Sequence, residues 1–200
     1  MNQKKVWNEI APSWSKYRNK TLKTVKDFLK GKKGKILDIG CGSGRNFAAQ
    51  EGLEFYGIDF SKNMISLAKI QADKLNIKAH LSVQEADNLN FRENFFDNII
   101  CFSVLNCIKS DKKRKESLKE INRVLKPKGK VLISSWGKNS SRLKSKEKEC
   151  EVPWTTAKDK KVKRYTYTYN LSELEKECKE AGFRITKTWE DENVNLILEK

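Results

Sequence analysis

The alternation of short apolar runs with amphipathic segments constrains the fold of this chain most strongly. Runs rich in β-branched and aromatic residues predict strands at 35–40, 53–59, 77–83, 95–102 and 130–136. Apolar residues at helical spacing predict helices at about 44–50, at 61–75 after a Ser61 cap, and at 111–125. Strands that alternate with helices form a parallel sheet through right-handed crossovers. The sequence therefore predicts an α/β fold with helices on both faces of a mostly parallel sheet.

The two ends of the chain complete this prediction. Strands at 183–189 and 194–198 are joined by an acidic turn too short for a parallel crossover, so they should form a hairpin. A capping box from Ser172 to Glu175 should open the helix before them. The amphipathic segment 1–34 predicts one or two helices interrupted near Pro12. A length of 200 residues suits a single domain over 1–200, with segments 1–34 and 137–170 as basic flanks.

The positive charge is concentrated in those flanks. The chain has a formal net charge of +16, and residues 1–35 hold 11 Lys and Arg against 2 Asp and Glu. Residues 137–170 hold 10 against 4, whereas the body between the two segments is nearly balanced. This distribution indicates a polyanionic partner. The alternative is ordinary solvated charge in a lysine-rich protein.

Several classes of protein are disfavoured by composition. No run approaches the roughly 18 apolar residues of a membrane span, and the first residues have no apolar signal-peptide core. We therefore expect a soluble, cytoplasmic protein without a membrane partner. The five cysteines show no CxxC spacing, so neither a disulfide framework nor a metal site is expected. The single histidine, His80, falls within a predicted strand and is expected to be structural.

A glycine-rich turn carries the sharpest functional signal. Residues 38–44 directly follow a buried strand, and Gly40 and Gly42 allow a tight turn and a close approach to a ligand. The N-terminus of the predicted helix after the turn offers free N–H groups to a carboxylate. A dinucleotide loop is the competing interpretation, yet no third glycine stands at the position that it needs. A merely structural turn is the other alternative.

Two acids at the ends of the following strands strengthen the ligand-binding interpretation. Asp59 ends the second strand, where a carboxylate can accept both ribose hydroxyls, and Phe60 beside it could flank an adenine. Asp87 follows the third strand and is placed to meet an adenine amino group. Either acid alone would more often be a turn or cap residue, but together they favour a nucleoside site.

The glycine turn, the two acids and the terminal hairpin together resemble the class I S-adenosylmethionine-dependent methyltransferases. The resemblance implies a Rossmann-like seven-stranded sheet in the order 3-2-1-4-5-7-6, with the last strand antiparallel. It also implies S-adenosylmethionine as cofactor and S-adenosylhomocysteine as product. The residues that it places at the cofactor are Asp38, Gly40, Cys41, Gly42, Gly44, Arg45, Asp59, Phe60, Asp87, Asn88, Leu89 and Ser103.

A narrower resemblance rests on segments along nearly the whole chain, chiefly 10–18, 91–97, 123–127, 152–154, 164–165 and 193–200. In this order they look like the tRNA methyltransferases that esterify the carboxymethyl group of wobble uridine. That resemblance implies the anticodon loop of tRNA as partner and a small zinc-binding activator subunit. The chain departs from the family pattern at Asn106 and Cys107, where paired histidines are usual, and at Lys128 and Val194.

Methylation of a carboxylate requires mainly that its oxygen be positioned in line with the methyl group, because the carboxylate is ionised without a general base. A guanidinium binds a carboxylate or phosphate bidentately, so Arg18 and Arg164 are the first catalytic candidates, with ordinary surface charge as the alternative. Asn106 could donate a hydrogen bond to the substrate, or it could serve packing or capping.

Aromatic residues in the flanks are candidates to stack on unpaired bases. These are Tyr17, Trp136, Trp154 and Tyr165. Core packing is the alternative for Trp136, and an edge strand would equally explain the alternation of tyrosine and threonine at 165–169. Two other functions stay open: methylation of a small molecule or protein, and a non-catalytic scaffold that binds S-adenosylmethionine and RNA.

Overall fold

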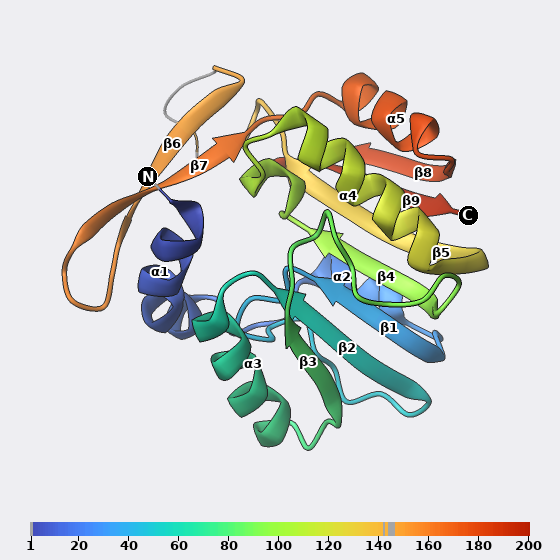
Figure 1. Ribbon diagram of the computed structural model, residues 1–200, viewed down its shortest axis with the longest axis horizontal. Helices are drawn as coiled ribbons and strands as arrows, with labels where there is room; N and C mark the ends of the chain where they lie inside the picture. The colour runs from blue at the N-terminus through green and yellow to red at the C-terminus, as the bar shows by residue number, and fades with distance from the viewer. Residues whose placement is uncertain (1, 142, 144–146) are drawn as a thin grey trace.

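A seven-stranded sheet forms the centre of the molecule in a computed structural model that describes residues 2–141, 143 and 147–200 (Figure 1). The strand order is β3-β2-β1-β4-β5-β9-β8. The first five strands pair in parallel, and β9 is antiparallel to both β5 and β8. The predicted topology is therefore confirmed, with β8 and β9 as its sixth and seventh strands. Strand bounds are β1 Gly34–Ile39, β2 Leu53–Asp59, β3 Ala79–Val83, β4 Phe96–Phe102, β5 Leu125–Trp136, β8 Arg184–Glu190 and β9 Asn193–Glu199.

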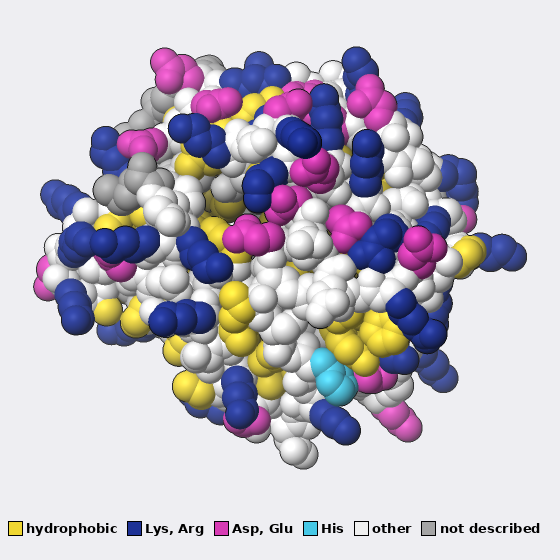
Figure 2. Space-filling view, in the orientation of Figure 1, with side chains coloured by type: hydrophobic (Ala, Val, Ile, Leu, Met, Phe, Trp, Pro, Cys, Tyr) yellow, Lys and Arg dark blue, Asp and Glu magenta, His cyan; other side chains and the backbone are white. Residues whose placement is uncertain are grey.

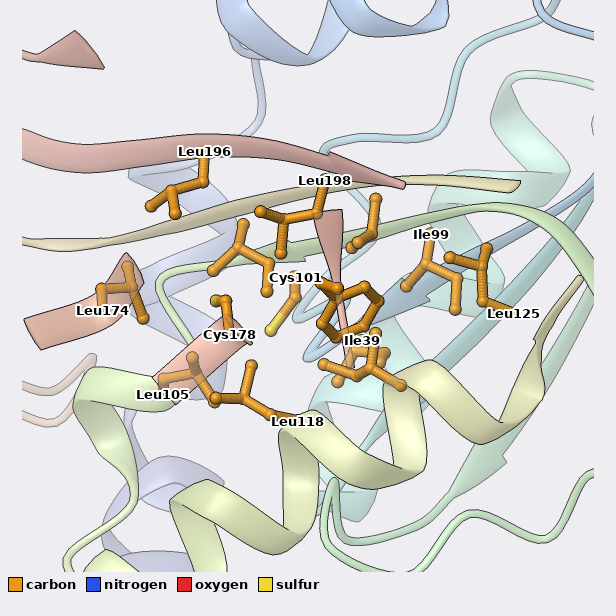
Figure 3. Close-up of a cluster of buried hydrophobic side chains, with 14 of the residues drawn as sticks. Ile39, Ile99, Cys101, Leu105, Leu118, Leu125, Leu174, Cys178, Leu196 and Leu198 are labelled. Carbon is orange, nitrogen blue, oxygen red and sulfur yellow. The ribbon is translucent and has the colours of Figure 1, made fainter. Parts of the chain in front are cut away.

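Both faces of the sheet are buried, which explains why its central strands read as continuous apolar runs. One face packs against α4 (Asp111–Val124) and α5 (Leu171–Glu180), and its cluster includes Ile39, Cys101, Leu118 and Leu174 (Figure 3). The other face packs against α2 (Lys23–Leu29) and α3 (Lys62–Lys74). Because successive side chains of a strand point to opposite faces, neighbouring residues of one strand serve different cores.

Helix α1 (Gln3–Tyr17) runs through Pro12 without interruption, so the predicted break near Pro12 is wrong. Proline lacks the N–H that would bond the carbonyl of Asn8, four residues earlier. Asn63 compensates, because its Nδ2 donates to the Asn8 carbonyl at 3.0 Å. The Asn8 Oδ1 in turn accepts from Ser61 Oγ at 2.8 Å and from the Asn63 backbone N–H at 3.1 Å. These bonds fix α1 against the start of α3.

Two helix predictions are wrong. Residues 44–50 do not form a helix: 44–46 are turns and 47–50 are irregular, because Gly44 has a φ of +80° and supports the bonds Gly44 N–H to Cys41 O and Phe47 N–H to Gly44 O. Helix α5 begins at Leu171 with Asn170 as its cap, rather than with the predicted box at Ser172. The Asn170 Oδ1 accepts from the Glu173 N–H at 2.8 Å, and Ser172 Oγ donates to the same oxygen.

A two-stranded antiparallel hairpin occupies most of the segment between β5 and α5. Its strands are β6 (Glu149–Thr155) and β7 (Lys161–Tyr167), and Figure 1 shows them near α1, on the side of the sheet where the parallel strands end. The aromatic alternation at 165–169 is therefore largely that of a strand. Residues 142 and 144–146 of the predicted basic segment 137–170 lie outside the described residues.

Basic side chains are spread over the face of the molecule that Figure 2 shows. In Figure 2, lysine and arginine side chains are distributed over the whole face, including the part where the hairpin and α1 lie, and acidic side chains are interspersed among them. His80 bonds Glu54 at 3.1 Å and stacks on Tyr56 with ring centroids 4.5 Å apart, in agreement with its expected structural role. Among the described residues, no helix combines the length and apolar character needed to cross a membrane.

Candidate functional site

A cavity of about 760 Å³ opens at the carboxyl ends of β1, β2 and β4. The carboxyl edge of a parallel sheet is where ligands bind in open α/β folds. On one side the cavity is lined by the glycine-rich turn and the end of β2; on the other it is lined by α1, the hairpin and the start of β9. Two groups of predicted residues, from distant parts of the chain, therefore face one space.

The glycine-rich turn has the backbone that the sequence predicts. Gly40, Gly42 and Gly44 have φ values of +63°, +55° and +80°, which glycine adopts without strain. A Cβ at Gly40 would lie 2.4 Å from Cγ2 of Val104, and a Cβ at Gly44 would lie 2.8 Å from the Phe47 ring. Gly40 and Gly42 line the cavity, whereas Gly44 packs behind the turn and does not. Turns, not a helix N-terminus, therefore present the N–H groups here.

Asp59 ties this turn to the second strand. Its Oδ2 accepts the Gly42 N–H at 3.1 Å, and its Oδ1 accepts the Ser61 N–H at 2.9 Å. Burial raises the pKa of the Asp59 carboxyl to about 6, although both bonds act in the opposite direction. Each carboxylate oxygen has lone pairs left for a ligand in the cavity.

Asp38 lies beneath the turn and does not line the cavity. Burial raises the pKa of its carboxyl to about 7, and the neighbouring Asn46 side chain partly opposes this shift. Within the described residues, neither Asp38 oxygen makes a hydrogen bond of normal geometry, and the buried Oδ1 of Asn46 has no partner either. Asn46 does line the cavity. Unsatisfied acceptor oxygens of Asp38 and Asn46 are therefore found next to the glycine-rich turn.

The other predicted cofactor residues divide into two groups. Cys41, Arg45, Phe60, Asp87 and Ser103 line the cavity. Ser103 has a φ of +58°, and Asp87 is bonded by the Lys113 Nζ at 2.9 Å. Asn88 and Leu89 lie outside the lining, because Asn88 is exposed and Leu89 packs in the main core.

Arg164 is a buried positive charge in the wall of the cavity. Its side chain is 6% exposed, and its guanidinium carbon lies 5.1–5.7 Å from the ring centroids of four tryptophans. A cation near several aromatic faces is stabilised by their quadrupoles, and this partly offsets its loss of hydration. The aromatic cage is formed by Trp7, Trp14, Trp136 and Trp154. It holds a permanent positive charge against the cavity.

Asn106 and Cys107 connect the two sides of the cavity. They lie in the short helix η1 (Leu105–Cys107), where the Asn106 Nδ2 donates to Cys107 Sγ at 3.4 Å. Burial raises the pKa of the Cys107 thiol to about 12; Arg164 acts to lower it and Asp59 to raise it further. η1 thus lies within electrostatic reach of both the caged arginine and the buried acid.

The structure brings five of the seven predicted substrate-side residues to the cavity. Trp136, Trp154, Arg164, Asn106 and the exposed Arg18 line it. Two do not. Tyr17 is 69% exposed at the end of α1 and lies outside the lining. Tyr165 is buried in the main core, because successive residues of β7 face opposite sides and Arg164 takes the cavity side.

Sequence reasoning missed two walls of the aromatic cage. Trp7 and Trp14 lie seven residues apart, which places them on one face of α1. Their ring centroids are 5.2 Å apart, and Trp14 lies 5.1 Å from Trp154. Trp154 also donates from Nε1 to Ser13 Oγ at 2.8 Å. The heptad spacing of the tryptophans was the available signal. Asn193, at the start of β9 opposite Trp136, is a further lining residue that was missed.

Comparison with known proteins identifies the family of this chain. A family model described as a methyltransferase domain matches residues 30–182, and the chain belongs to that family. The tRNA (carboxymethyluridine(34)-5-O)-methyltransferase of Saccharomyces cerevisiae is 31% identical over 163 residues, which cover 78% of this chain and 57% of that protein. The Arabidopsis thaliana protein of the same name is 36% identical over 134 residues, 66% of this chain and 32% of that protein.

Among solved structures, a methyltransferase of Haloferax volcanii in complex with the Trm112 methyltransferase activator has the same fold. Its TM-score is 0.72 at 15% identity, and the match covers 100% of this chain and 98% of that chain. The chain spans 33% of the length of relatives from Bos taurus, Mus musculus and Homo sapiens.

Proposed function

We propose that the chain is an S-adenosylmethionine-dependent tRNA methyltransferase that converts the carboxymethyl group of wobble uridine to its methyl ester. The observation that carries this proposal is the shared cavity. The glycine turn with Asp59 and the caged Arg164 are more than 100 residues apart in the chain, yet both line one cavity. A site that joins a nucleoside-type pocket to a buried guanidinium suits transfer to an anionic acceptor.

The residues on the first side fit S-adenosylmethionine. Gly40 and Gly42 leave room for close approach, and Asp59 retains acceptor capacity toward ribose hydroxyls. Phe60 would flank the adenine, and Asp87 would accept from its amino group. Asn46, which lines the cavity, would help to hold the ammonium of the methionine part, and Asp38 would support this contact from beneath the turn; the buried Oδ1 of Asn46 and both Asp38 oxygens have no partner among the described residues. When bound, the cofactor supplies an electrophilic methyl group on a sulfonium.

The residues on the second side fit a carboxylate acceptor. The acceptor needs no general base, because an ordinary carboxylate is ionised near neutral pH. Arg164 would hold the carboxylate through paired N–H donors, and the tryptophan walls would exclude water from it. Bound S-adenosylmethionine would supply the methyl group to the carboxylate oxygen, and the protein would not need to move a proton. Orientation is thus the main catalytic task of Arg164 and η1.

Charge and shape support an RNA substrate over a small one. Segments 1–35 and 137–170 carry most of the +16 charge, and basic residues from both, namely Arg18, Lys23 and Arg164, line the cavity. Arg18 lines the cavity and lies 5.6 Å from the Trp14 ring, in a position to contact a phosphate near a bound base. Trp136 and Trp154 offer aromatic surfaces for a splayed base. A small molecule or a protein as the acceptor, and a non-catalytic scaffold, are the competing functions.

A small zinc-binding activator subunit is part of the proposal. The Haloferax volcanii relative in fold was solved with the Trm112 activator, and its match covers this whole chain. We expect the activator to increase methyl transfer by this chain, and a cytoplasmic setting in which both meet tRNA.

The test is mass spectrometry of nucleosides from carboxymethyluridine-containing tRNA incubated with the protein and S-adenosylmethionine, with and without activator. A methyl ester of carboxymethyluridine, absent when Asp59→Ala replaces the wild type, is expected. Methyl incorporation into protein or into a small acid, with none in tRNA, would favour the first competing function. Tight cofactor binding without any methyl transfer, even with activator, would favour the scaffold.

A further inference from the structure

Asn106 lines the cavity and carries an unsatisfied acceptor oxygen, whereas the sequence suggested it as a donor. The residue is 2% exposed, and its Nδ2 already donates to Cys107 Sγ at 3.4 Å. Its Oδ1 is buried and has no hydrogen-bond partner in the part of the chain that the structure describes. An unsatisfied buried acceptor costs about 1–3 kcal/mol, so a donor on a ligand is favoured here.

The position of this oxygen restricts which ligand can supply the donor. Asn106 lines the cavity with Arg164, and its neighbour Cys107 lies within electrostatic reach of both Arg164 and Asp59. The amide is therefore at the junction between the cofactor side and the substrate side. A carboxylate held by Arg164 has acceptor atoms only, so within the substrate the donor to Asn106 is a ring N–H of the base that bears it.

We propose that Asn106 reads the target base, with its Oδ1 accepting the N3–H of a uracil ring whose 5-substituent carboxylate is bound by Arg164. This inference rests on the proposed function and adds a residue that sets base specificity. Uracil offers a single ring N–H, at N3, whereas a cytosine ring has an acceptor at that position. A polar group left unpaired in a buried site discriminates strongly against the wrong ligand.

A second buried acceptor faces the same cavity but lies elsewhere. The Oδ1 of Asn193 also has no partner among the described residues, and Asn193 pairs with Trp136 across β5 and β9. It therefore belongs to the sheet end of the aromatic cage and not to the η1 junction. Its presence agrees with a ligand that brings N–H or O–H donors to this space.

The test is a double-mutant cycle that combines a change at Asn106 with a change at N3 of the target base. Two anticodon stem-loop RNAs are compared at saturating S-adenosylmethionine, one with 5-carboxymethyluridine at the wobble position and one with the same base methylated at N3. Wild-type protein should methylate the N3-methylated RNA with a kcat/KM that is lower by roughly tenfold or more. This factor corresponds to the loss of one hydrogen bond that leaves a buried acceptor unpaired. In Asn106→Ala the difference between the two RNAs should disappear.

Asn98→Ala is the matched control. Asn98 is 6% exposed on β4 and does not line the cavity, so its variant should keep the wild-type preference between the RNAs. If wild type methylates both RNAs equally, or Asn106→Ala keeps the full preference, Asn106 does not read N3 and the inference is overturned while the proposed function stands. If wild type, assayed with the activator, binds S-adenosylhomocysteine but methylates neither RNA, the proposed function falls, and the inference falls with it.

Discussion

Replacement of Arg164 by alanine should separate substrate binding from cofactor binding. A hydrogen bond to a charged group contributes about 1.5–3 kcal/mol, so loss of a bidentate contact removes at least about 3 kcal/mol. At about 1.4 kcal/mol per factor of ten, kcat/KM for tRNA should fall by roughly 150-fold or more. The Kd for S-adenosylhomocysteine should change by less than about threefold, because Arg164 lies on the opposite side of the cavity from Asp59.

The same substitution should also reduce stability. Four tryptophan rings lie 5.1–5.7 Å from the guanidinium, and each such contact contributes of the order of 0.5 kcal/mol or more. We expect a loss of about 2 kcal/mol in the free energy of unfolding. Arg164→Lys keeps the charge but not the paired donors, so it should recover stability better than kcat/KM.

Single-turnover methylation of carboxymethyluridine tRNA, with calorimetry and thermal melting on the same samples, measures these effects. Arg123→Ala is the control: Arg123 is partly buried, donates to the carbonyls of Leu89 and Phe91, and does not line the cavity. It should reduce stability with little change in kcat/KM. Equal effects of the two variants on kcat/KM, at temperatures where both are folded, would refute a substrate role for Arg164.

Three further predictions follow from buried polar groups. Asp59→Ala should weaken S-adenosylhomocysteine binding by roughly 100-fold or more in calorimetry, and Asp59→Asn by less, because one acceptor oxygen remains; unchanged affinity in both would remove Asp59 from the site. Asp38 has its pKa raised from 3.8 to about 7, so its contribution to stability is greatest in acid and is lost as pH rises through about 7. The ligand-free protein should therefore gain Tm between pH 8 and pH 5.5, by roughly 2–4 °C per kcal/mol, and Asp38→Asn should flatten this slope; an identical slope in the variant would contradict it. Asn8→Ala should cost about 1–2 kcal/mol in urea unfolding, because it frees Ser61 Oγ and the Asn63 N–H, and a neutral effect would show that α1 is held by apolar contacts alone.

The sheet could be predicted because its signal is local. The strands that bury both faces, such as β4 with Ile99, Ile100 and Cys101, are uninterrupted apolar runs. The predicted helix break at Pro12 was wrong because the contact that compensates for the proline is distant in the sequence. The side chain that satisfies the free carbonyl of Asn8 is Asn63, and nothing in the sequence near Pro12 reveals that contact.

Some residues of the candidate site could be placed from the sequence, and others depend on tertiary contacts. Asp59 ends β2 and Gly40 directly follows β1, so their place at the carboxyl end of the sheet is fixed by topology alone. Whether Arg164 or Tyr165 faces the cavity depends on the register of β7, and a shift of one residue would exchange them. The cage needed tryptophans from α1, β5 and β6 to meet, and only the tertiary structure brings those elements together.

A crystal structure of the protein with S-adenosylhomocysteine would test most directly whether one cavity serves both the methyl donor and a carboxylate. The ribose hydroxyls should lie within hydrogen-bond distance of the Asp59 carboxylate, and the sulfur should face the space between Asn106 and Arg164. A ligand bound outside this cavity, or a sulfur separated from Arg164 by protein, would contradict the assignment.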